Sequence, residues 1–218
     1  MSVYVPKIVA KCRTLYAAAP IVRFATTKDM IEAHSEILYA GHQQRNDAVV
    51  APINNWHPGL IGKDAETVFE FEFGINDARL AISRECGYES WDDAVARSEP
   101  IDVHFENAVD LALDGDLSGL HASLSDQPQL LNQTSSFGHR ATILIYMGSN
   151  GVEFWRQVVP DNICDIVKLL VDLGADPTDQ ANVYGGQFDV LALAESSAHP
   201  TAAGVRDQLL ALLTSFTK

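Results

Sequence analysis

The stretch Asp161–Pro177, with the sequence DNICDIVKLLVDLGADP, decides the fold of this chain. Its apolar residues recur at spacings of three and four, which is the pattern of an amphipathic helix with one buried face: Ile163, Ile166, Val167, Leu170 and Leu173. Asp161 or Asn162 can cap the start of this helix, and Gly174 stands where a left-handed residue can end it. The stretch therefore predicts a helix of about three turns that packs on one side.

The regions around this helix repeat the same plan of two helices and a turn. A shorter helix is expected upstream, over Thr142–Gly151, and another pair lies within Phe105–Asn132. A third pair is expected over Asp189–Ala194 and Gly204–Leu213, and the polar C-terminal residues that follow suit a terminal cap. The second helices of the first two pairs are 46 residues apart.

These segments resemble ankyrin repeats of the bacterial type. Leu173-Gly174-Ala175-Asp176 is similar to the ending of an ankyrin repeat, and Thr142 to Gly151 is similar to its first helix. In that helix Ile143 replaces the usual proline and Ile145 the usual histidine. The ankyrin period is about 33 residues, so the resemblance implies an insertion of about 13 residues, which we place near 152–164. The resemblance implies an all-α stack of helix pairs with hairpin tips, which functions by protein–protein recognition and needs no cofactor.

The N-terminal half is less regular. Residues 29–100 are expected to form a degenerate repeat and an irregular helical cap before the repeats of 101–218. Within it, a helix is expected to end at Gly87, and Ser90 with Asp93 resembles the capping box of the next helix. Phe69–Phe73 alternates strictly between aromatic and acidic residues, which predicts a short strand.

Charge divides the chain unevenly. Residues 1–28 carry +5 and no acid, so the remaining 190 residues carry −19 of the total of −14. The basic segment is interpreted as an N-terminal arm, with an organelle-targeting segment as the alternative. An acidic body repels phosphate, so we expect neither nucleic acid nor a membrane as partner. Three widely spaced cysteines indicate reduced thiols and favour a cytoplasmic protein.

Chemistry-bearing motifs of common enzymes, such as phosphate-binding loops, nucleophile elbows and zinc-ligand helices, do not occur in the sequence. We expect neither a catalytic site nor a metal site, and the sequence favours a binding protein over an enzyme. The candidate binding residues surround the insertion and the two neighbouring hairpin tips, and Trp, Tyr and Arg are frequent at binding hot spots: His139, Arg140, Asn150, Glu153, Trp155, Arg156, Gln157 and Tyr184.

Three alternatives stay open for this cluster. Its aromatic residues can simply pack over the end of the array. His139, Glu153 and Arg156 supply the acid, base and anion-holding groups of a catalytic site, although not at a known spacing. The insertion and the N-terminal half can also close a pocket for a small molecule over the groove. We expect Trp155 and Arg156 to project from a loop at the rim, because an insertion between packed helices is excluded from the core.

Overall fold

The computed structural model describes residues 2–216 and is mostly helical. Its α-helices are α1 Lys7–Tyr16, α2 Thr27–Gln43, α3 Val50–Trp56, α4 Ala65–Glu70, α5 Ile75–Glu85, α6 Trp91–Ala96, α7 Val103–Leu113, α8 Leu117–Asp126, α9 Ile143–Tyr146, α10 Ile163–Asp172, α11 Val190–Ser196, α12 His199–Ala202 and α13 Arg206–Phe216. The strands are β1 Val3–Tyr4, β2 Val159–Pro160, β3 Gln180–Val183 and β4 Gly186–Asp189. The predicted predominance of helices is confirmed.

The helix α10 begins and ends where its sequence predicts. Gly174 has φ +106°, and the amide of Ala175 donates to the carbonyl of Leu170 at 2.9 Å. The amide of Gly174 donates to Val171, so the two bonds form a Schellman ending. Ile163, Ile166, Val167 and Leu170 are buried. Four of the five residues of the predicted stripe therefore lie in the core, whereas Leu173, which follows the helix, is exposed.

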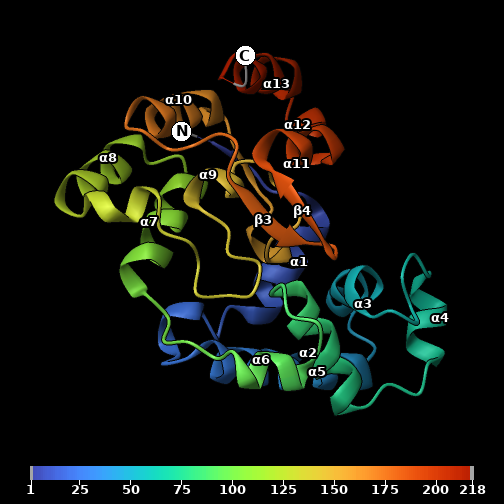
Figure 1. The fold of residues 1–218 in the computed structure, drawn as a ribbon. Coiled ribbons are helices and arrows are strands. Elements are labelled where there is room, and N and C mark those ends of the chain that lie inside the picture. Colours follow the sequence, from blue (N-terminus) through green and yellow to red (C-terminus); the bar gives the residue numbers. More distant parts are fainter. Residues whose placement is uncertain (1, 217–218) are drawn as a thin grey trace.

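The C-terminal half contains two layers of helices (Figure 1). The first helices α7, α9 and α11 contact one another in series, and the second helices α8, α10 and α13 do the same. The antiparallel hairpin β3–β4 follows α10, with Gln180 paired to Asp189 and Val183 to Gly186. The pairs differ in length and spacing, and no regular repeat is detected in the described chain.

Residues 2–28 are packed into the molecule (Figure 1). β1 pairs antiparallel with β2, where Val3 lies opposite Pro160. In α1, Val9, Cys12 and Tyr16 are buried and the helix contacts the 3₁₀ helix Phe154–Arg156. The basic N-terminal segment, expected as an arm, is thus part of the core.

The rest of the N-terminal half is built on α2, which packs against α5. The Ser90 side chain accepts from the amide of Asp93 at 3.2 Å, so the predicted cap of α6 is confirmed. The predicted strand Phe69–Phe73 is wrong. Asp64 accepts a hydrogen bond from the amide of Thr67 and starts α4, which extends to Glu70. This cap outweighs five residues of alternating pattern, which have no neighbouring strand to pair with.

Candidate functional site

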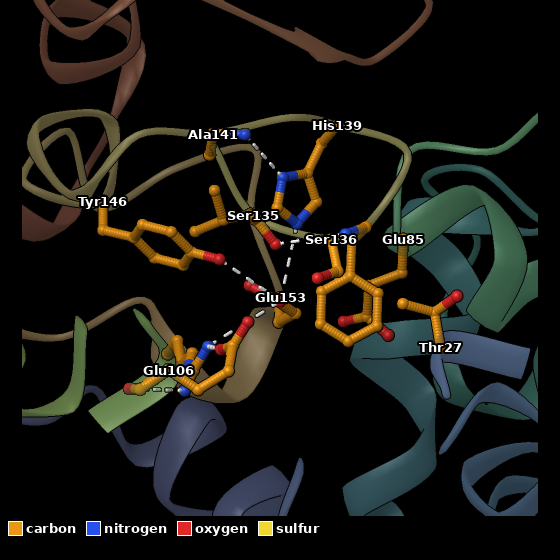
Figure 2. Close-up of polar contacts among 12 residues, drawn as sticks. Thr27, Glu85, Glu106, Ser135, Ser136, His139, Ala141, Tyr146 and Glu153 are labelled. Carbon is orange, nitrogen blue, oxygen red and sulfur yellow. Dashed lines mark hydrogen bonds and ion pairs between the residues drawn. The ribbon is translucent and has the colours of Figure 1, made fainter. Parts of the chain in front are cut away.

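A network of buried charged side chains lies at the centre of the molecule (Figure 2). The Nε2 atom of His139 lies 3.4 Å from Oε1 of Glu153, and the hydroxyl of Tyr146 donates to the same oxygen at 3.4 Å. Each of these three side chains is fully buried. The amide of Ala141 donates to Nδ1 of His139 at 3.1 Å. Nδ1 is therefore an acceptor, and the ring proton on Nε2 points at Glu153.

Arg156 joins this group to helix α7. Its guanidinium forms ion pairs with Glu106, which is fully buried, and with Asp110 at 2.8 Å. It also lies 3.9 Å from Oε1 of Glu153. Burial raises the pKa of Glu153, but the neighbouring His139 and Arg156 outweigh it and lower that pKa below its ordinary value. Three carboxylates, of which Glu106 and Glu153 are buried, thus meet one buried cation.

A third buried acid comes from α5. Oε1 of Glu85 accepts a hydrogen bond from the amide of Phe154 at 2.8 Å. Burial raises the pKa of Glu85 to about 8, although the bond from Phe154 opposes the rise. Glu85 is consequently protonated at neutral pH and contacts the insertion as a neutral acid.

The insertion near 152–164 is not a loop at the rim, so that prediction is wrong. Glu153, Arg156 and Gln157 are buried and Trp155 is partly exposed, whereas Asp161, just before α10, is exposed. A buried loop needs partners for its backbone polar groups. Here Glu85 accepts from the amide of Phe154, β1 pairs with β2, and the Gln157 side chain donates to the carbonyl of Val152. The 3₁₀ helix Phe154–Arg156 adds internal bonds. The N-terminal half provides the cover that makes this burial favourable.

The three residues of the catalytic alternative do meet, because His139, Glu153 and Arg156 lie within ion-pair distance. However, His139 and Glu153 line none of the described pockets. Arg156 does line one of these pockets, and its buried ion pairs join α7 to the insertion. A change at Arg156 is therefore expected to lower stability, in contrast to the surface role that the sequence predicts.

The predicted hairpin tip at Tyr184 is confirmed. Tyr184 and Gly185 connect β3 to β4 with φ of +54° and +76°, as a type I′ turn requires. Tyrosine is rarely found in this left-handed conformation. The Tyr184 ring stacks on Trp56 at 4.9 Å with an interplanar angle of 8°, and its hydroxyl donates to Asn150 at 2.8 Å. The side chain is therefore held in place while half of it stays exposed.

Tyr184 forms the wall between two hollows. On one side is a pocket of about 150 Å³ that Trp56, Arg84 and Asn182 also line. On the other is an open cleft of about 410 Å³, which we call the tip cleft. Besides Tyr184, its polar lining consists of amides, hydroxyls and one histidine, without a Lys, Arg, Asp or Glu: Asn54, Asn55, Asn150, Gln157, Ser196, Ser197 and His199. This cleft brings together Asn150, Gln157 and Tyr184 of the predicted set.

A second concave site, the junction pocket, has a volume of about 230 Å³ and lies between the two halves. α1 contributes Arg13 and Tyr16, α2 contributes His34, and the insertion contributes Trp155 and Arg156. Asp110, in the last turn of α7, and Asp114, which follows that helix, add two carboxylates to the lining. Tyr16, His34 and Trp155 contact one another, with ring centroids 4.2 to 5.1 Å apart.

Arg140 lies apart from both sites. It forms an ion pair with Glu99 and donates to the carbonyl of Ser135 at 3.3 Å. The backbone of its neighbour His139 bonds to Cys86 and to Asn182. The tip at 135–141 therefore docks on the end of α5 and on β3, so the N-terminal half covers part of the expected groove.

Residues from distant parts of the sequence complete these sites, and they were not predicted. Glu85 continues the buried stripe of α5 after Ala78 and Ile82, and Glu106 stands one position after Phe105 on the buried face of α7. An acid in phase with an apolar stripe is a signal of a buried partner. His34 and Arg13 carried no comparable signal, because only the fold brings α1 and α2 to the insertion.

Within residues 2–216, no group of three His, Cys, Asp or Glu side chains lies close enough to hold a metal ion. Over the same range no helix is long and apolar enough to cross a membrane. Cys12 and Cys86 are buried free thiols and Cys164 is a partly exposed one. Burial raises the pKa of all three thiols, which keeps them protonated.

No protein-family model, curated protein or solved structure gives a significant match to this chain.

Proposed function

We propose that this protein is a recognition module of the ankyrin type, which binds a segment of a partner protein at the tip cleft. Two features support an ankyrin-type stack. First helices contact first helices and second helices contact second helices through three successive pairs. Neighbouring tips are also bonded to each other, because the amide of Asn182 donates to the carbonyl of His139 at 2.8 Å.

The observation that carries the proposal is the placement of Tyr184. An aromatic side chain in a strained turn, fixed by Trp56 and Asn150 yet half exposed, is arranged for contact with something outside the chain. Phe188, on the next strand, is 36% exposed and adds apolar area. The amide side chains of the adjoining cleft match the donors and acceptors of a peptide backbone. The absence of charge from the lining of that cleft favours a partner segment without charged side chains.

Tyr184→Asn tests this function, because Asn-Gly is the preferred pair for a type I′ turn. The variant removes the aromatic surface together with its stack on Trp56 and its bond to Asn150, and it also relieves the turn. The losses and the gain oppose each other, so the variant should still fold. Proteins captured from native lysate by the wild type should be identified, purified and titrated. We expect Tyr184→Asn to weaken binding about tenfold or more.

Tyr4→Asn is the matched control, since Tyr4 has 36% of its surface exposed and lies on β1, outside the hairpin. This control should keep the full affinity of the wild type. Equal affinity of wild type and Tyr184→Asn for the captured partner would contradict the proposed function.

A further inference from the structure

The junction pocket contains groups that the folded chain leaves without partners. Nε2 of His34 lies 2.8 Å from the carbonyl of Ala19, so this nitrogen carries the proton. Nδ1 of the same ring is buried and has no hydrogen-bond partner among the described residues. Burial lowers the pKa of His34 to about 4, against the opposing effect of the Ala19 carbonyl. At neutral pH the ring therefore offers an unused acceptor in the lining of the pocket.

Charges of both signs border the same pocket. Arg13, on α1, is exposed and forms no ion pair within the described chain. Asp114, at the end of α7, is likewise exposed and unpaired there. Asp110 is half exposed and has one oxygen on Arg156. The pocket thus presents one available cation from one wall and available carboxylate oxygens from another.

The walls between these charges are largely apolar. Trp155 and Tyr16 present aromatic surface, and Ile21 and Leu113 add aliphatic surface. The volume of about 230 Å³ is below the range of about 300–1,000 Å³ for drug-sized ligands. The space suits a molecule of roughly a dozen heavy atoms and excludes a folded partner or a long peptide.

We propose that the junction pocket binds a small zwitterion, a free α-amino acid with an apolar side chain. Its carboxylate pairs with Arg13, its ammonium group donates to Asp114, Asp110 and Nδ1 of His34, and its side chain lies against Trp155 and Tyr16. Each contact with a charged group contributes more than a neutral hydrogen bond. This site is separate from the tip cleft, and its occupancy is independent of the proposed protein recognition.

Calorimetric titration of the full chain with four probes tests the proposal. L-phenylalanine and L-leucine carry both charges, phenethylamine carries only the ammonium group, and 3-phenylpropionate carries only the carboxylate. We expect L-phenylalanine to bind, and each singly charged analogue to bind about tenfold more weakly than L-phenylalanine. Absence of heat and of thermal stabilisation with both amino acids at about ten millimolar overturns the proposal.

Two variants locate the charges of the ligand. Arg13→Ala should weaken amino-acid binding to the level of phenethylamine and leave phenethylamine itself unaffected. Asp114→Ala should weaken amino-acid and phenethylamine binding while sparing 3-phenylpropionate. Both residues are exposed, so both variants should fold. Lys7→Ala and Asp126→Ala are matched controls of the same charge, and neither residue lines a described pocket. Binding that survives Arg13→Ala and Asp114→Ala as it survives the controls overturns the assignment.

Discussion

At the scale of single residues, the buried acids determine how this protein responds to pH. The pKa of Glu85 is raised from 4.5 to about 8 in the folded chain. Between these values the folded state holds a proton that the unfolded state has lost, so stability falls as pH rises. His34 has the opposite effect up to pH 6.5, because its pKa is lowered to about 4. The interval from pH 6.5 to 8 therefore isolates the contribution of Glu85.

Glu85→Gln should remove this dependence. The amide oxygen can still accept from Phe154, but no ionisation occurs. We expect the free energy of unfolding of the variant, relative to wild type, to increase by about 2 kcal/mol between pH 6.5 and 8. Urea denaturation at several pH values measures the difference. Glu89→Gln is the control at an exposed position and should follow the wild type. A constant difference between wild type and Glu85→Gln would show that Glu85 does not titrate in this interval.

At the scale of the helices, one amphipathic element shows how position on a face sets the effect of a substitution. In α10, Leu170 is fully buried. Leu173, the residue that follows the helix, is 43% exposed. The two leucines are three positions apart, yet only one contacts the core. Both residues are leucines, so their side chains alone do not predict the difference in burial. The difference follows from the face of the helix on which Leu170 lies and from the helix ending before Gly174.

Leu170→Asp should therefore cost roughly 3 kcal/mol or more, because it removes core packing and buries a carboxylate without a partner. The same change at Leu173 should cost less than about 1 kcal/mol, since the new carboxylate stays in water. Thermal unfolding followed by circular dichroism compares the two variants. Equal losses would mean that the register of α10 is wrong.

At the scale of the whole molecule, the N-terminal half and the helix pairs share one core. α1 contacts the insertion, Glu85 bonds to Phe154, and the tip at His139 bonds to Cys86. These contacts join segments that are far apart in the sequence. Unfolding should consequently be cooperative across the chain, in contrast to an array whose parts unfold separately.

Val9→Asp tests this cooperativity. Val9 is fully buried in α1, whereas its neighbour Ile8 is 47% exposed. Val9→Asp should lower the melting temperature of the entire helical signal in a single transition, and Ile8→Asp should change it little. A variant that loses only a fraction of its helicity and keeps a second transition at the wild-type temperature would show that residues 2–28 are an appendage.

Local sequence was sufficient to predict the elements whose signals lie within a few neighbouring residues. The stripe and Gly174 located α10, Ser90 located the start of α6, and the glycines after Val183 located a hairpin tip. Such signals operate over a few residues, because caps and helical periodicity are local properties of the backbone. The alternating run Phe69–Phe73 failed for a related reason, since a strand needs a partner that lies elsewhere.

Only the tertiary structure determined which of the predicted site residues are buried and which line a pocket. Glu153 and Arg156 have the composition of a surface cluster, and their burial depends on Glu85, Glu106 and α1, which lie 47 or more residues away along the chain. The same packing separated seven of the eight predicted residues among a buried ion-pair network, the junction pocket and the tip cleft, and it placed Arg140 apart from them on Glu99. Burial of a charge is favourable only when a partner and a cover are supplied together. The partner and the cover both come from distant segments, so the sequence of 152–164 alone does not determine whether its charged residues are buried.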